Sequence, residues 1–167
     1  MRTVETSEYV GLLKSLADDG HTVRVEICGG SMLPFLAPHI DAALIKKPDR
    51  PLRCGDIVFC RIPSARGERY ILHRISRITD DGFYMIGDAQ NVCEGPFPES
   101  CVFGVAVSVV RRGKTVTPES LVWKFYSGPW LRHAALRRAA LRLRKGPLRR
   151  RGRGKGGDPS GSAEKTL

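Results

Sequence analysis

The sequence predicts a mainly β fold, preceded by a helix and followed by a basic helical arm. Residues 23 to 116 contain short apolar runs that alternate with a period of two and are separated by Gly, Pro and Asp. The chain has 167 residues, 41% of them hydrophobic, which suits one domain with its own core. Its net charge of +11 is concentrated after residue 110, so it describes the C-terminal arm rather than the β domain.

A helix is expected at residues 6–19, within an N-terminal helical segment that we assign to residues 1–20. Its apolar residues recur at helical spacing, and Gly20 ends the run: Tyr9, Val10, Leu12, Leu13 and Leu16. Acidic residues interrupt the first 20 positions, so we expect no leader peptide there. Nowhere does the chain approach the roughly 18 apolar residues of a transmembrane helix.

The β domain is assigned to residues 21–117. Strands are expected at 23–27, 42–45, 56–62, 70–79, 83–86, 102–111 and 115–116. Asp80-Asp81-Gly82 predicts a hairpin turn between two of them. In the run 56–62, Ile57 and Phe59 should face one side of the sheet and Val58 and Cys60 the other.

The segment 118–145 is predicted to form a basic arm of two helices, 119–126 and 130–145, separated by a break at Gly128-Pro129. On a helical wheel its apolar residues separate poorly from its arginines. Trp130, Ala134 and Leu141 fall on one side, and Leu136, Ala140 and Leu143 on another. Residues 146–167 are rich in Gly, Arg, Ser and Pro, and this composition predicts disorder.

A serine that follows two glycines is the first candidate for chemistry. Ser31 stands in Gly29-Gly30-Ser31-Met32-Leu33-Pro34, where the glycines can adopt positive φ and leave room for a substrate chain. A serine nucleophile needs a base within hydrogen-bond reach. His73 is the candidate, because an ordinary histidine with a pKa of about 6.5 is mostly neutral at pH 7. Alternatively, Ser31 is only a turn residue, and His73 is a core histidine.

Four segments in this order resemble the signal peptidase I and LexA-like serine peptidase superfamily. They are Gly30–Pro34, Gly55-Asp56-Ile57-Val58, His73-Arg74-Ile75 and Gly87-Asp88-Ala89-Gln90-Asn91, and the resemblance covers residues 9–117. It implies a small signal-peptidase/LexA-like β domain with Ser31 as nucleophile. Most members use a lysine base, and one branch uses a histidine followed by Arg, which corresponds to His73. Lys46 and Lys47 come too early in the chain to match the lysine.

The resemblance also implies supporting residues. Asp88 is a site residue, and Glu94 occupies the position of an acidic partner that orients the histidine. Backbone N–H groups of Ser31, with Gly29 or Gly30, would form the oxyanion hole. Where relatives carry a serine hydroxyl donor, this chain has Gly29. Met32 and Pro34 are expected in the substrate groove, which in relatives accepts small residues such as Ala or Gly beside the scissile bond.

The cysteines indicate the redox environment of the protein. There are five cysteines and no Cys-x-x-Cys pair, which favours a reducing, cytoplasmic location over a disulfide framework. Cys93, Cys101 and a histidine do not follow a zinc spacing, and we expect no metal and no cofactor.

The expected substrate is a peptide or protein precursor. Between residues 111 and 155 there are 15 Lys and Arg against Glu119 alone, a net +14. This arm, residues 118–155, is predicted to meet an anionic membrane surface on the inner face, with Trp130 at the interface. We rank nucleic acid below it as a partner. A solvated tail without a partner stays open.

The sequence thus predicts a serine endopeptidase that removes a leader or signal-like segment from a precursor. One alternative is an inactive peptidase-like fold that serves as a basic nucleic-acid or membrane-binding module. The other is a LexA-like self-cleaving regulator. Only 30 residues precede Ser31, too few for a helix-turn-helix domain, and no Ala-Gly pair occurs.

Overall fold

The structure, a computed structural model, describes residues 6–65 and 67–145. Its centre is a mainly antiparallel sheet with strand order β1-β2-β7-β3-β4-β5-β6, and β8 also pairs with β7. The predicted mainly β class is confirmed. The strands are β1 (Val23–Glu26), β2 (Ala42–Lys46), β3 (Ile57–Ser64), β4 (Gly67–Thr79), β5 (Gly82–Ile86), β6 (Glu94–Phe97), β7 (Val102–Arg111) and β8 (Lys114–Val116).

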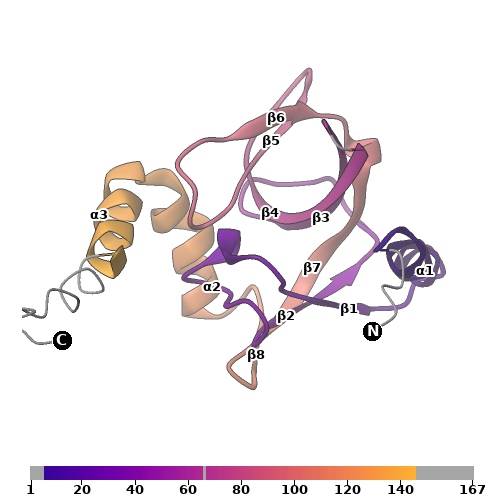
Figure 1. Cartoon of the computed structure of the whole chain (residues 1–167), viewed down its shortest axis with the longest axis horizontal. Coiled ribbons are helices and arrows are strands. Elements are labelled where there is room, and N and C mark those ends of the chain that lie inside the picture. The colour runs from indigo at the N-terminus through magenta and orange to yellow at the C-terminus, as the bar shows by residue number, and fades with distance from the viewer. Residues whose placement is uncertain (1–5, 66, 146–167) are drawn as a thin grey trace, which may run out of the picture.

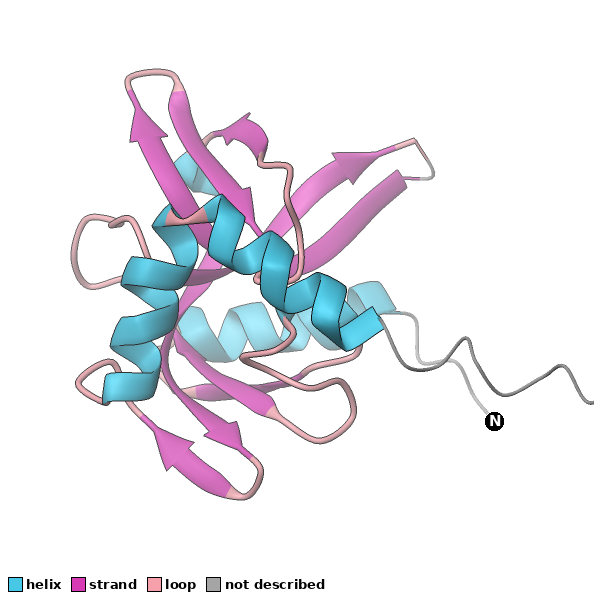
Figure 2. Cartoon of the chain, turned by 90° about the vertical axis from the view of Figure 1, so that its left-hand side faces the viewer, coloured by secondary structure: helices cyan, strands magenta, loops and turns pink. Residues whose placement is uncertain are grey.

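Helices flank this sheet on two sides. The N-terminal helix α1 (Thr6–Asp18) lies on one side, and α2 (Leu121–Phe125) and α3 (Ala134–Lys145) lie on the other (Figure 1). In the turned view of Figure 2, α2 and α3 lie in front of the sheet and α1 lies behind it. Among the described helices, none combines the length and apolar character needed to cross a bilayer.

The first half of strand β3 is buried on both faces, and Arg61, Pro63 and Ser64 in its second half are exposed. Ile57 and Phe59 belong to a core shared with α1 and β1. Val58 and Cys60 belong to a second core, which includes Phe83 and other residues of β5. A central strand that serves two cores is apolar along its whole length, and this explains the run Ile57–Cys60.

The α1 helix packs through a narrower face than its apolar residues suggest. Val10, Leu13 and Ala17, spaced at i, i+3 and i+7, are buried against the sheet. Leu12 lies just outside this face and is 59% exposed. The helix itself is confirmed at almost the predicted bounds.

Strand β6 has no counterpart among the predicted strands. Its sequence, Glu94-Gly95-Pro96-Phe97, contains the two residues least typical of strands. It forms nonetheless because β6 is the last strand of the sheet, where Pro does not interrupt a ladder on both sides. β6 begins at Glu94, and this strand brings the Glu94 carboxylate to Arg69 of β4.

The predicted break in the arm falls a few residues later than Gly128-Pro129. The chain stays helical from α2 through a wide helical turn, Tyr126–Trp130, and leaves the helix at His133, before α3 begins at Ala134. Trp123 and Trp130 are both buried, and the Trp130 indole N–H donates to the Asp88 carbonyl at 3.0 Å. Trp130 therefore anchors the arm to the β domain and does not sit at a membrane interface.

The buried side of the arm also includes a cation. Arg137 is 4% exposed and donates from Nη1 to the carbonyls of Trp130 and Leu131. The predicted disordered segment 146–167, with the last arginines of the arm, falls outside the described residues, as do residues 1–5.

Candidate active site

Ser31 lies in a short 3-10 turn, Gly30–Met32, that follows β1. Met32, Phe35 and Leu36 are each at most 1% exposed and fix this turn to the core. The Gly30 and Ser31 N–H groups begin the turn, so no earlier helical carbonyl is available to them. This is the environment expected of oxyanion-hole donors.

The two glycines before Ser31 contribute the absence of a side chain and no unusual backbone conformation. Gly29 has a φ of −104°, and Gly30 is not among the positive-φ glycines, so the expected left-handed backbone is wrong. A Cβ at position 29 would meet no atom within 4 Å, because Gly29 borders an open cavity. The segment therefore leaves room for a ligand beside Ser31 without backbone strain.

His73 reaches the same cavity from β4. It pairs with Val58 of β3, and its side chain is 4% exposed. Its Nδ1 atom is buried and has no hydrogen-bond partner among the described residues. A buried polar atom without a partner is uncommon, and such atoms occur at sites where a ligand or a reacting group completes the bonding.

Ser31 and His73 line one cavity of about 420 Å³. The rest of its wall is almost wholly apolar and comes from α1, β1 and its continuation, β3 and β4. The lining comprises Val10, Leu13, Val25, Glu26, Ile27, Cys28, Gly29, Met32, Phe59, Tyr70, Ile71 and Leu72. Met32 thus lines the cavity beside Ser31, and the cavity volume falls within the range of ordinary ligand pockets.

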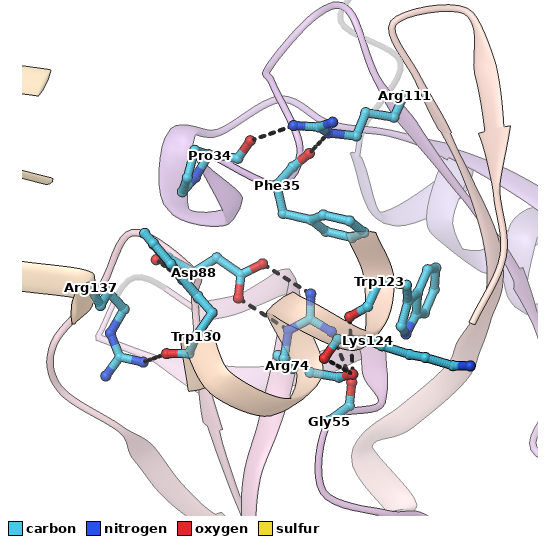
Figure 3. A network of polar contacts seen from close by, with 11 residues as sticks. Pro34, Phe35, Gly55, Arg74, Asp88, Arg111, Trp123, Lys124, Trp130 and Arg137 are labelled. Carbon is cyan, nitrogen blue, oxygen red and sulfur yellow. Dashed lines mark hydrogen bonds and ion pairs between the residues drawn. The ribbon is translucent and has the colours of Figure 1, made fainter. Parts of the chain in front are cut away.

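Pro34, by contrast, is not part of the cavity wall. Its carbonyl and that of Phe35 accept hydrogen bonds from the Arg111 guanidinium at 3.4 and 2.7 Å, as Figure 3 shows. These bonds tie the chain after Ser31 to β7. Pro34, which the resemblance implies for the substrate groove, therefore lies outside the lining of this cavity and helps to hold the turn in place.

The environment of His73 favours the neutral imidazole. Burial lowers the pKa of His73 below its usual range. The Glu94 carboxylate acts in the opposite direction and raises this pKa, whereas the Arg69 guanidinium lowers it further. A neutral imidazole can accept a proton from a serine, so the base form prevails at neutral pH.

Glu94 acts on His73 through space. Its carboxylate forms an ion pair with Arg69, four residues before His73 on β4. No hydrogen bond joins Glu94 to His73 in the part of the chain that the structure describes. The charge of Glu94 therefore tunes the proton affinity of His73, and its hydrogen-bonding capacity goes to Arg69.

We expect the Arg69–Glu94 pair to set the pH profile of catalysis. Proton uptake by His73 removes the base, so kcat/KM should fall on the acidic side, with a midpoint below the usual histidine range. Glu94→Gln removes the charge that raises the pKa, which should move this midpoint to lower pH. Arg69→Met should move it to higher pH. Shifts in the same direction for both variants would contradict the assignment.

Asp88 is held by Arg74. Arg74 Nε and Nη2 each donate to one Asp88 oxygen at 3.1 Å, and both side chains are at most 1% exposed (Figure 3). Burial raises the pKa of Asp88, and the charge and hydrogen bonds of Arg74 oppose that rise. Among the described residues, Asp88 makes no hydrogen bond with His73, and its carboxylate is bound by Arg74. Strand alternation places His73 and Arg74 on opposite faces of β4, so a partner of one does not reach the other.

Arg74 joins three segments around Ser31. Its Nη1 donates to the Gly55 carbonyl at 3.0 Å, and its guanidinium lies 5.1 Å from the ring centroid of Phe35. Phe35 follows the Ser31 turn, Gly55 precedes β3, and Asp88 follows β5. The ion pair therefore fixes the Ser31 segment relative to the strand that carries His73.

The turn at residues 87–90 presses directly on Ser31. The Ala89 N–H donates to the Ser31 carbonyl at 2.8 Å. A Cβ on Gly87 would lie 2.6 Å from that carbonyl oxygen and 3.1 Å from its carbon. Only glycine permits this approach, which explains Gly87 in the segment Gly87–Asn91.

Gly87→Ala should impair catalysis more than folding. The added methyl group forces the Ser31 backbone to move, and a displacement of about 1 Å can cost about 100-fold in rate. We expect kcat/KM to fall on that order while the circular dichroism spectrum is retained. Gly128→Ala is the matched control, because a Cβ there meets no atom within 4 Å. Equal activity of the two variants would contradict the role of this contact.

Arg74, Gly87 and Arg69 were not assigned roles from the sequence. Arg74 and Gly87 stand inside the segments that carry the family resemblance, and alternation along β4 could have placed Arg74 opposite His73. Arg69 had no such signal, because its proximity to Glu94 depends on β6. Comparison with known proteins found no matching family model, curated protein or solved structure.

Proposed function

We propose that the chain is a serine endopeptidase in which Ser31 is the nucleophile and His73 the general base. The observation that carries this proposal is the shared cavity. Ser31 and His73 both line one largely apolar cavity. His73 is buried, and its Nδ1 has no hydrogen-bond partner among the described residues. No described hydrogen bond joins the two side chains. In free enzymes such contacts are often long and tighten when substrate binds.

The reaction proceeds through an acyl-enzyme. His73 takes the proton of Ser31 as Oγ attacks the scissile carbonyl, and the N–H groups of Gly30 and Ser31 stabilise the oxyanion. His73 then gives the proton to the leaving amine as the peptide C–N bond breaks. A water, deprotonated in turn by His73, hydrolyses the ester and releases Ser31.

Two open strand edges offer a path for an extended substrate. Among the described residues, β1 ends the sheet and pairs only with β2. Within the described residues, β4 pairs with β5 only from Arg74 onward, so Tyr70–His73 have one edge without a strand partner. Residues of both edges line the cavity. A peptide can therefore add to an exposed edge through main-chain hydrogen bonds, a common mode of peptide recognition.

The apolar wall supports a leader or signal-like segment of a precursor as substrate. A location at the inner membrane face would suit such a substrate. The described part of the arm supports contact with anionic lipid, because Lys124, Arg132, Arg138 and Arg142 are exposed, as is Phe125.

A serine-directed covalent probe tests the proposed activity. We expect a fluorophosphonate to add one equivalent to the protein, with the adduct on Ser31 by peptide mapping and absent in Ser31→Ala. His73→Ala should label far more slowly. Labelling whose amount and position are the same in wild type, Ser31→Ala and His73→Ala would exclude the mechanism. DNA or anionic-vesicle binding that survives Ser31→Ala, without any adduct, would favour a binding module. Fragments of the chain itself on incubation would favour a self-cleaving regulator.

A further inference from the structure

We propose that the cavity beside Ser31 selects a bulky aliphatic or aromatic side chain of the substrate, and that α1 forms its specificity wall. This inference rests on the proposed peptidase function and names the residue class that the site accepts. It departs from the small-residue preference that the family resemblance implies.

The size of the cavity is the first argument. At about 420 Å³ it lies within the roughly 300–1,000 Å³ of sites that hold whole ligands. The methyl group of an alanine would leave most of this space to water in contact with apolar walls. A leucine or phenylalanine side chain displaces that water and gains dispersion contacts with the wall.

The chemistry of the wall is the second argument. Most of its lining is apolar, and among the described lining residues the one carboxylate is Glu26. Glu26 is exposed and pairs with Arg24 at 2.7 Å. An acidic substrate side chain inside the cavity would thus lose its water without gaining a partner.

The origin of the wall is the third argument. Val10 and Leu13 of α1 line the cavity and are also part of the core that joins α1 to β1 and β3. The helix therefore closes one side of a site whose reacting groups come from the β domain. Leu12, the neighbour of Leu13, is exposed and lies outside the lining.

Peptide binding can be measured without catalysis. Cys28 lines the cavity and is exposed, whereas Cys54 is exposed but outside the lining, so one molecule carries both a reporter and its control. In the Ser31→Ala protein, octapeptides of Gly and Ser with a single Leu, Phe, Ala or Glu would compete with N-ethylmaleimide. Peptide mapping reads each cysteine separately.

We expect Leu and Phe peptides to protect Cys28 at concentrations at least about tenfold lower than the Ala peptide needs, with Cys54 unaffected. The Glu peptide should not protect. Equal protection by Ala and Leu, or no protection by any peptide, would overturn the proposal.

The role of α1 is tested by two leucines of the same helix. Leu13→Ala should weaken protection by the Leu peptide about tenfold, and Leu12→Ala should leave it unchanged. If Leu13→Ala does not fold, Val10→Ala takes its place, because Val10 is the other α1 residue that lines the cavity. Indistinguishable Leu12 and Leu13 variants would remove α1 from the specificity site.

Cleavage assays with the wild-type protein separate the two proposals. Selective protection of Cys28 without any cleavage would refute the peptidase but leave the bulky-residue site standing. Cleavage of Ala peptides in preference to Leu peptides would support the peptidase and refute the bulky-residue site.

Discussion

Replacing His73 with alanine is expected to lower kcat/KM for peptide cleavage by between about 10² and 10⁴ fold, the usual contribution of a general base. Without the imidazole, Ser31 keeps its proton until water removes it. The nearby Glu94 cannot substitute, since its carboxylate is bound to Arg69. Rates on a cleaved peptide, measured for wild type and variant at one pH, give the loss directly.

The effect should be specific to this histidine. His21→Ala, at an exposed loop residue after α1, should retain wild-type kcat/KM. Because Nδ1 of His73 has no partner among the described residues, His73→Ala breaks no described hydrogen bond there. We therefore expect urea unfolding to show a folded His73→Ala protein. Wild-type activity in that folded variant would exclude His73 as the base.

Replacing Arg74 with methionine is expected to lower the free energy of unfolding by about 3–5 kcal/mol, the cost of breaking a buried ion pair from one side. The change removes the guanidinium from between Asp88 and Gly55 and leaves the Asp88 carboxylate buried without its counter-ion. Urea titration with an unchanged m value would measure this loss as a shift of the midpoint.

Two controls give that number its meaning. Arg77→Met removes an exposed cation on the same strand, 4.1 Å from the Tyr84 ring centroid, and should cost about 1 kcal/mol or less. Arg74→Met combined with Asp88→Leu removes both charges and should be more stable than Arg74→Met alone. Equal stability of the Arg74 and Arg77 variants would show that the pair does not hold this part of the fold.

Local patterns predicted most of the sheet because most strands carry their own signal. Alternation in 23–27 and the apolar run 102–111 correspond to β1 and β7, and the two-sided run 56–62 corresponds to β3. β6 was not predicted, because a strand that contains Gly and Pro forms only at the edge of an existing sheet. The helical path through Gly128-Pro129 likewise depends on tertiary contacts, above all those of Trp123 and Trp130.

For the candidate site, the sequence indicated which residues lie near one another better than it indicated which groups they bind. Ser31, His73 and Met32 lie at one cavity. The partner of Asp88 depends on which face of β4 turns toward the loop after β5, a relation between segments that spacing alone does not encode. Pro34 illustrates the same limit, because its surroundings are set by Arg111, 77 residues later.

The arm shows how composition can mislead about location. Trp130 among arginines resembles an interfacial anchor, yet its indole bonds the Asp88 carbonyl inside the protein. The buried Arg137 then reinforces this contact through the Trp130 carbonyl. Lys124, Arg138 and Arg142 are exposed and form no salt bridge with another described residue, while Trp123 and Trp130 are buried and serve the fold.

The most direct test of the account is a double-variant cycle on peptide cleavage with Ser31→Ala, His73→Ala and the combined variant. Groups that act as one catalytic unit are strongly non-additive. We predict that each single variant loses nearly as much activity as the double variant, with wild type alone cleaving efficiently. Losses that add on a logarithmic scale, or cleavage that persists in Ser31→Ala, would contradict the pairing of Ser31 with His73.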